Sequence, residues 1–113
     1  MIYKILPLFF LFIYIHTFAQ EGTLKGKVTS KESKEPIPFA TVIIERGGKQ
    51  IAAASCDFDG IYTIKPIAPG TYDVKATHIE NHPLTIQSVI IPPDKITFLD
   101  IQMTSQVTQL QVV

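Results

Sequence analysis

The chain has 113 residues, of which 46% are hydrophobic and 18% charged, and its ten basic residues balance ten acidic ones. This length fits one small domain and excludes a multidomain enzyme within the chain. A formal net charge of zero argues against the basic face that unspecific nucleic-acid binding requires, so we expect no nucleic-acid partner. Eight prolines and six glycines are spread along the chain, which disfavours bulk disorder.

An apolar leader opens the chain. Residues 1–19 hold one lysine and then an almost unbroken apolar run that reaches Ile15. The run is shorter than the ~20 residues that cross a bilayer, and small residues at the two positions that a signal peptidase inspects permit cleavage before Gln20. We therefore expect a cleaved signal peptide at 1–19 and no membrane span. The alternative is an uncleaved N-terminal anchor.

Cys56 is the only cysteine of the chain, which excludes an internal disulfide and a cysteine-based zinc cluster. In an oxidising compartment an exposed lone thiol could pair with another chain, and burial would prevent this. No Cys-His arrangement accompanies Cys56. The sequence therefore predicts a small core residue at this position and not a nucleophile.

From Thr23 onward apolar and polar residues alternate with period two, and turn residues interrupt the alternation at short intervals. The pattern predicts seven strands, at residues 24–29, 40–45, 49–56, 61–67, 72–77, 84–91 and 95–103. Gly47 and Gly48 supply the positive-φ pair of a tight hairpin. Pro69-Gly70 fits a type II turn, and Gly60 ends a turn that requires a positive φ.

Seven short strands at roughly ten-residue spacing predict an all-β fold, an antiparallel β-sandwich that spans residues 20–103. No connection is long enough for a crossover helix, which disfavours parallel strands. No helical apolar stripe is found after the leader. The positions expected to face inward are Leu24, Val28, Val42, Ile44, Ile51, Ala53, Tyr62, Ile64, Tyr72, Val74, Ile86, Val89, Ile101 and Met103.

Two stretches of the chain resemble carboxypeptidase regulatory-like domains. The first is GKVTSKESKEPIPFATVII, a strand followed by a proline and then Ala-Thr-Val. The second is DFDGIYTIKPIAPGTYDVKATHI, in which Gly60 and Tyr62 precede the Pro69-Gly70 turn and Tyr72. The resemblance covers residues 22–103 and implies a seven-stranded, transthyretin-like (prealbumin-like) sandwich.

Exported copies of this domain also resemble the N-terminal extension of TonB-dependent outer-membrane receptors. In those receptors a valine-rich segment follows the sandwich and leads to the plug and barrel. The tail at residues 104–113 carries no charge, and its end, with Leu110, Val112 and Val113, looks like the start of such a segment. We expect no plug or barrel within 113 residues, so transport would not be a property of this polypeptide alone.

Two patterns partly match metal sites, and we expect neither to bind a metal. His78, Glu80 and His82 straddle a strand end and a loop, where solvent-exposed polar side chains are the alternative. Asp57 and Asp59 are spaced like the first ligands of a calcium loop, but the required acidic residue at position 68 is an alanine. Aspartates in this setting form turns.

The sequence also lacks the motifs of nucleophilic catalysis and of phosphate binding, so we expect no enzyme, no catalytic residue and no cofactor. The first hypothesis is a non-catalytic interaction module in the periplasm or at the periplasmic face of the outer membrane. Its partner would be an envelope protein, either a receptor plug and barrel or an energy-transducing protein, bound by a free strand edge or by the tail.

The second hypothesis is a stand-alone domain that binds carbohydrate or peptidoglycan. Sugar sites present exposed aromatic side chains, and here only Phe39 and Phe58 lie near loops and outside the expected core. A third alternative is a scaffold domain with no activity of its own.

Overall fold

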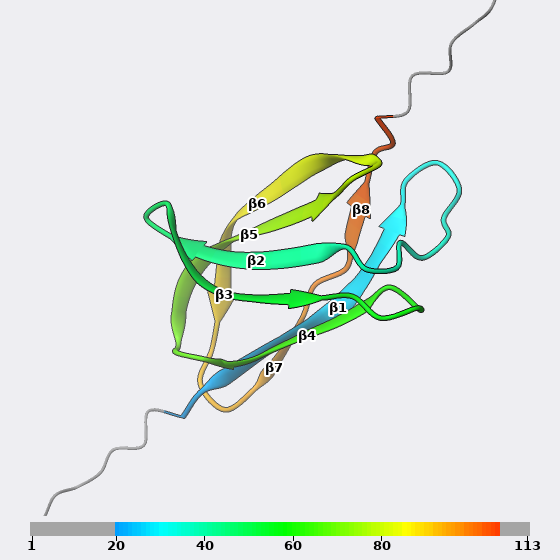
Figure 1. Ribbon diagram of the computed structural model, residues 1–113. Helices are drawn as coiled ribbons and strands as arrows, with labels where there is room; N and C mark the ends of the chain where they lie inside the picture. The colour runs from blue at the N-terminus through cyan, green and yellow to red at the C-terminus, as the bar shows by residue number, and fades with distance from the viewer. Residues whose placement is uncertain (1–19, 107–113) are drawn as a thin grey trace, which may run out of the picture.

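The structure is a computed structural model that describes residues 20–106, and within them it contains eight strands and no helix (Figure 1). The strands are β1 (Gly22–Ser30), β2 (Thr41–Arg46), β3 (Lys49–Ser55), β4 (Ile61–Ile67), β5 (Gly70–His78), β6 (Asn81–Ile91), β7 (Ile96–Phe98) and β8 (Ile101–Met103). The predicted signal peptide at 1–19 and the tail residues Leu110, Val112 and Val113 lie outside the described residues. No helix among the described residues is long and apolar enough to cross a membrane.

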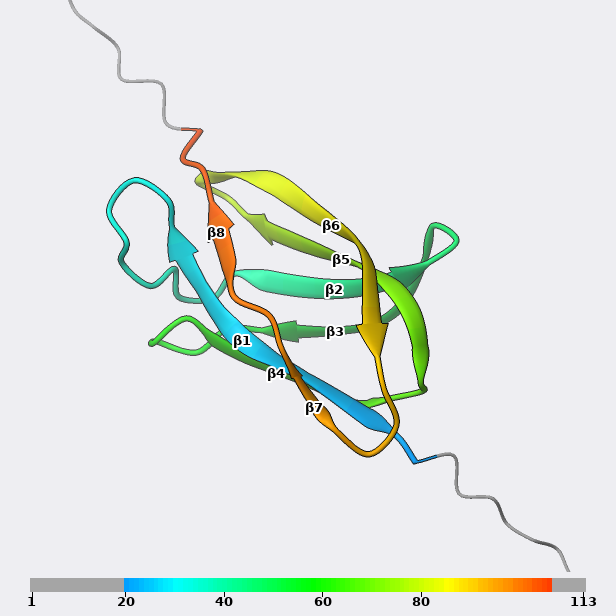
Figure 2. The ribbon, with the colours of Figure 1, turned by 180° about the vertical axis from the view of Figure 1, so that it is seen from behind.

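The strands form two four-stranded sheets that pack face to face as a sandwich (Figures 1 and 2). One sheet, which we call sheet I, has β1 at its centre, with β4 on one side and β7 and β8 on the other. The other, sheet II, has the order β3-β2-β5-β6. The predicted all-β sandwich is therefore confirmed.

The strand count and one strand direction differ from the prediction. The strand expected at 95–103 is divided into β7 and β8, and both run parallel to β1. Parallel strands were disfavoured because short connections cannot cross between neighbouring strands in one sheet. The chain avoids this limit because all of sheet II lies between β1 and β7 in sequence, so no crossover helix is needed.

The division between β7 and β8 has a local cause at Gly26, in the middle of β1. The Leu99 carbonyl turns toward β1 and accepts a hydrogen bond from the hydroxyl of Tyr62. A Cβ atom on Gly26 would lie 1.8 Å from that carbonyl oxygen. The missing side chain of Gly26 thus leaves the space in which the last strand bends.

The core between the sheets contains most of the expected side chains, and Leu24, Val42 and Met103 have no exposed surface. Ile86 is partly buried against this core. The predictions for Ile51 and Ala53 are wrong, since both side chains are exposed. A register shift between β2 and β3 leaves Ile51 without an opposite residue, so Ala52 and Ala54 turn inward instead.

Further core residues were not among the expected inward positions, although Ala40, Ala76 and Ile91 continue the alternation of their strands. They are Ile37, Ala40, Ile67, Ala76 and Ile91. Cys56 is 2% exposed, so the expected small core residue is confirmed. Burial, followed by the nearby charge of Asp57, raises the pKa of the Cys56 thiol to about 11.

Two of the predicted turns agree with the structure and one does not. Gly47 and Gly48 have φ values of +58° and +77°, and Gly60 has +73°. Gly70 is not in the left-handed region and begins β5, so the type II turn expected at Pro69-Gly70 is wrong. The glycine is instead close to Arg46, whose guanidinium lies 4.7 Å from the ring centre of Tyr72.

Candidate interaction surfaces

Several connections gather at one end of the sandwich, which we call the loop end (Figure 1). They are the β1–β2 loop at residues 31–40, the β3–β4 turn at 56–60, the β5–β6 turn at 79–80 and the segment at 104–106. Loops on a rigid sandwich are common positions for binding residues. The loop end is therefore the first place to look for a site.

An exposed aromatic pair lies at the loop end. Phe39 and Phe58 are 59% and 79% exposed, and their rings meet edge to face with centres 5.0 Å apart. An edge-to-face pair keeps at least one ring face open to a ligand. The fold thus brings together the two aromatic residues that the sequence singled out for sugar binding.

The backbone at Phe39 is held in an unusual conformation. Its φ is +61°, which is uncommon for a bulky side chain. Its N–H donates to the Cys56 carbonyl oxygen (3.2 Å), and the Cys56 N–H donates to the Ala40 carbonyl oxygen (2.8 Å). Because Ala40 is fully buried, the chain must turn sharply at Phe39, and this turn directs the aromatic ring outward. Strain of this kind is often found at binding sites.

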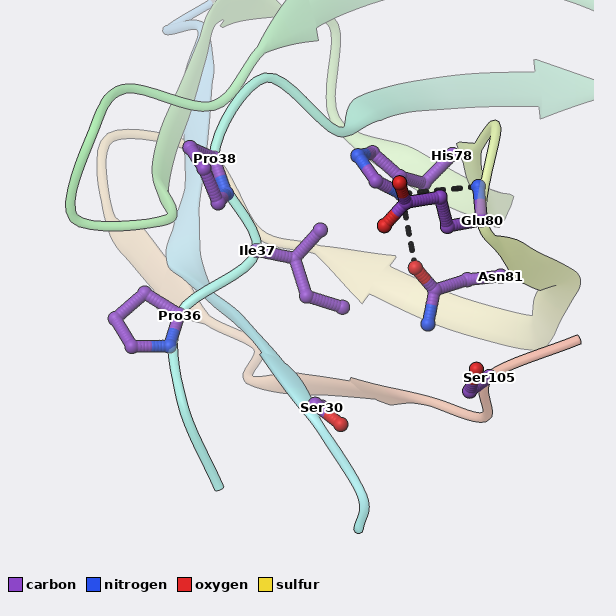
Figure 3. A pocket seen from close by; sticks show the side chains of 8 residues that line it. All are labelled: Ser30, Pro36, Ile37, Pro38, His78, Glu80, Asn81 and Ser105. Carbon is purple, nitrogen blue, oxygen red and sulfur yellow. Dashed lines mark hydrogen bonds between the residues drawn. The ribbon is translucent and has the colours of Figure 1, made fainter. Parts of the chain in front are cut away.

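A shallow pocket of about 200 Å³ also opens at the loop end (Figure 3). Its lining combines loop prolines with polar side chains from the β5–β6 turn, and the residues are Ser30, Pro36, Ile37, Pro38, His78, Glu80, Asn81 and Ser105. Asn81 is buried, and its side-chain oxygen lies 2.8 Å from Nδ1 of His78. The Glu80 N–H lies 3.3 Å from the same ring nitrogen, so Nδ1 is held inside the turn.

The metal patterns of the sequence act as turn structures in the fold. Nδ1 of His78 is engaged by Asn81 and Glu80, while the His82 side chain is exposed. Among the described residues no three His, Cys, Asp or Glu side chains lie close enough to hold a metal ion. The carboxylate of Asp57 accepts the N–H groups of Asp59 (2.9 Å) and Ile61 (3.0 Å), which is the geometry of an Asx turn.

The polar side chains of the pocket have structural partners. The hydroxyl of Ser30 donates to Glu32, and the ring nitrogen of His78 is in contact with the amide of Asn81. The Glu32 carboxylate also accepts the Ser105 N–H, and its pKa is lowered by hydrogen bonds, so it is a weak general base for the Ser30 hydroxyl. The geometry of these side chains therefore suits binding better than it suits bond cleavage.

The beginning of the expected tail, which we call the exit segment (residues 104–106), is attached to the sandwich. The Gln106 N–H donates to the Glu80 carbonyl oxygen (3.0 Å), and the Thr104 carbonyl oxygen accepts the His82 N–H (2.8 Å). The Ser105 N–H donates to both carboxylate oxygens of Glu32, at 3.2 and 3.4 Å. The exit segment is thus tied to both the β5–β6 turn and the β1–β2 loop.

Glu32 was not singled out from the sequence, where it stands among other charged residues of the β1–β2 loop. Hydrogen bonds from its own backbone N–H, from Ser105 and from Ser30 lower the pKa of its carboxyl group. Its partner at Ser105 is 73 residues away, so no local pattern indicates the contact. The buried Asn81 was also missed, although its partner His78 is only three residues away, because its burial depends on the geometry of the β5–β6 turn.

The fold agrees with the comparison to known families. The family model of the carboxypeptidase regulatory-like domain matches residues 23–104, and the chain belongs to this family. The resemblance expected from the sequence is therefore confirmed. No curated protein matches the chain.

Three solved structures show how widely the fold is shared. A protein from Bacteroides uniformis named for carbohydrate binding matches with 12% identity and a TM-score of 0.62, over 74% of this chain and 41% of that one. A chain of a type II cohesin–X-dockerin complex from Acetivibrio cellulolyticus matches with 26% identity and a TM-score of 0.56, over 73% and 56%. The 5-hydroxyisourate hydrolase of Klebsiella pneumoniae matches with 18% identity and a TM-score of 0.58, over 74% and 85%.

These similarities support a β-sandwich module and leave its activity open. The chain spans about two fifths of the Bacteroides protein and somewhat over half of the Acetivibrio chain. One of the three similar structures is an enzyme, so the fold alone does not decide between binding and catalysis.

Proposed function

We propose that the chain is a non-catalytic interaction module of the cell envelope, similar to the N-terminal extension of a TonB-dependent receptor. One observation carries the proposal. The described chain begins and ends at opposite ends of the sandwich, and the exit segment is fixed by hydrogen bonds at the loop end (Figure 1). A domain with this geometry can stand in line with further segments of a longer polypeptide and hold a fixed orientation to them.

The partner that we propose is a protein of the envelope. β3 is an outer strand of sheet II and is largely exposed, so its backbone edge can accept an added strand. A domain of the same fold occurs in a cohesin–X-dockerin complex, which is an assembly of proteins. The apolar tail residues Leu110, Val112 and Val113 are the second candidate for partner contact.

Fractionation of native cells tests the location and the setting of the domain. An antibody raised against residues 21–103 would be used to blot periplasmic and outer-membrane fractions. We expect a band much larger than the 12.6 kDa chain in the outer membrane. A small band in the periplasm would show a domain that acts alone, and a cytoplasmic band would contradict export.

Deletion of residues 107–113 distinguishes partner binding by the tail from partner binding by the edge of β3. If the tail binds the partner, crosslinking to envelope proteins in intact cells should be lost in the deleted chain. Unchanged crosslinking would contradict a role for the tail. In that case Ala53→Pro, which removes a backbone donor at an exposed position of β3, would test the strand edge.

Glycan binding is a second candidate function, and the Phe39–Phe58 pair is the observation that favours it. Aromatic ring faces bind the apolar faces of sugars, and the loop-end pocket, which is lined by Pro38 next to Phe39 in sequence, supplies polar groups from His78 and Glu80. A protein of the same fold is named for carbohydrate binding. The ligand would be a polysaccharide or peptidoglycan of the envelope.

A pull-down on insoluble peptidoglycan and cellulose tests this candidate. We expect the variant Phe39→Ala/Phe58→Ala to lose retention at least tenfold. Phe98→Ala is the matched control, because Phe98 is 72% exposed and lies on a different surface of the sandwich. Equal retention of the two variants and the unchanged chain would contradict glycan binding at the loop end.

A further inference from the structure

The outer face of sheet I combines lysines with large apolar side chains. We call it the lysine face, and its residues are Lys25, Lys27, Ile61, Lys65, Ile96 and Phe98. Figure 2 shows the sheet that bears this face turned toward the reader. Phe98 is 72% exposed, Ile96 54% and Ile61 37%, which is unusual exposure for side chains of this size.

Strand register places these side chains next to one another. Lys25 is opposite Thr63 of β4 on one side and opposite Phe98 of β7 on the other. Lys27 is opposite Ile61. The neighbours of these lysines in β1, Leu24 and Val28, point into the core, so the lysines point outward from the centre of the sheet.

The lysine face concentrates positive charge in a chain whose formal net charge is zero. Asp100 is the carboxylate at its edge, and that carboxylate accepts a hydrogen bond from the Lys27 backbone N–H (3.0 Å). Glu21 is a second carboxylate, which lies beside Lys65, while Asp57 in the β3–β4 turn and Glu45 in sheet II belong to other parts of the sandwich. The three lysines of the face outnumber these two carboxylates, so the face complements an anionic surface.

We infer that the lysine face docks on an anionic lipid surface. Protein interfaces place apolar side chains at the centre and are depleted in lysine, whereas here Lys25 occupies the central strand. Lysines interleaved with Phe and Ile are typical of segments that lie on membranes, where the ammonium groups meet lipid phosphates and the apolar side chains enter the headgroup region. The inference is independent of the proposed function.

Vesicle cosedimentation tests the inference. The protein would be purified as it accumulates in producing cells, so that processing at residues 1–19 is the same in every variant. We expect binding to equimolar phosphatidylcholine and phosphatidylglycerol vesicles, and much weaker binding to phosphatidylcholine alone. The variant Lys25→Gln/Lys27→Gln/Lys65→Gln should weaken binding roughly fivefold per lysine, on the order of a hundredfold in total. Phe98→Ser should weaken binding to the anionic vesicles without changing the net charge.

The matched control is Lys31→Gln/Lys49→Gln/Lys75→Gln, which removes the same charge from positions outside the lysine face. It should bind the anionic vesicles nearly as well as the unchanged chain. Equal losses in the two triple variants would overturn the inference, because net charge alone would then explain binding. A second result would also overturn the inference. In that result neither the unchanged chain nor any variant binds vesicles, while a polyglutamate peptide binds the unchanged chain and not Lys25→Gln/Lys27→Gln/Lys65→Gln. This would indicate an acidic protein partner.

Discussion

Gly60 satisfies two separate demands at the loop end. Its φ of +73° is a conformation that other L-residues rarely adopt. A Cβ atom at this position would also lie 2.6 Å from the Val28 carbonyl oxygen and 3.1 Å from Pro36. The residue therefore fixes the β3–β4 turn, which carries Phe58, against the β1–β2 loop.

Replacement of Gly60 tests both demands. Gly60→Val should reduce the free energy of unfolding by more than ~1 kcal/mol, measured by thermal or denaturant melting. Gly47→Val is the control, because Gly47 also has a positive φ but nothing within 4 Å of its added Cβ. Its loss should be smaller, since it lacks the steric clash. An unchanged melting midpoint in Gly60→Val would contradict the turn assignment.

Cys56 should be unreactive in the folded chain. Because its pKa is raised from 9.0 to about 11, the thiolate is on the order of a thousandth of the population at pH 8. Burial also blocks access. We expect a disulfide reagent to label the folded chain at least ~100-fold more slowly than the chain unfolded in denaturant. Equal rates would show that the thiol is exposed.

At the scale of elements, the exit segment and the β1–β2 loop are joined through Glu32. The contact depends on a charged carboxylate, because a carboxylate accepts hydrogen bonds from N–H groups more strongly than a neutral acid does. The pKa of Glu32 in the folded chain is below its ordinary value of 4.5. The contact is therefore complete above pH 4.5 and is lost as the pH falls through the lowered pKa.

An NMR titration measures this dependence. The amide proton of Ser105 should shift with an apparent pKa below 4.5, and the shift should be absent in Glu32→Gln. Glu35→Gln is the control, because it removes a carboxylate from the same loop and leaves the Glu32 carboxylate that accepts the Ser105 N–H. A Ser105 titration that persists in Glu32→Gln would contradict the contact.

At the scale of the whole molecule, sheet I depends on contacts between the two ends of the described chain. β1 pairs with β7 and β8, so the sheet is complete only when the last strands are present. Ile101 and Met103 are at most 1% exposed and fill the core beneath β1. Pairing between strands this distant in sequence makes the sandwich one cooperative unit.

Truncation tests whether the sandwich folds as one cooperative unit. A chain that ends at Pro93 should be unfolded, because burial of Ile101 and Met103 contributes about 1.5–3 kcal/mol each and domains of this size have only about 5–15 kcal/mol in total. A chain that ends at Gln106 is the control and should retain a dispersed amide NMR spectrum. A dispersed spectrum from the shorter chain would show that sheet I does not need its last strands.

The alternation of residues was sufficient to predict most of the sandwich. Period-two patterns place Leu24, Val42 and Val74 inward because side chains alternate along every strand. The same reasoning was wrong at Ile51, where the register shift between β2 and β3 reversed the faces. A shift of one residue has no signature in local sequence, since it depends on the partner strand.

The sequence by itself determined the class of fold, the family and the residues available for binding, since these depend on local alternation, turn residues and motifs. Only the tertiary structure decided which surfaces form. The Phe39–Phe58 pair, the Glu32–Ser105 contact and the lysine face each combine residues from different elements. Such groupings follow from strand register and loop packing, which depend on the free energy of the whole sandwich and not on neighbouring residues.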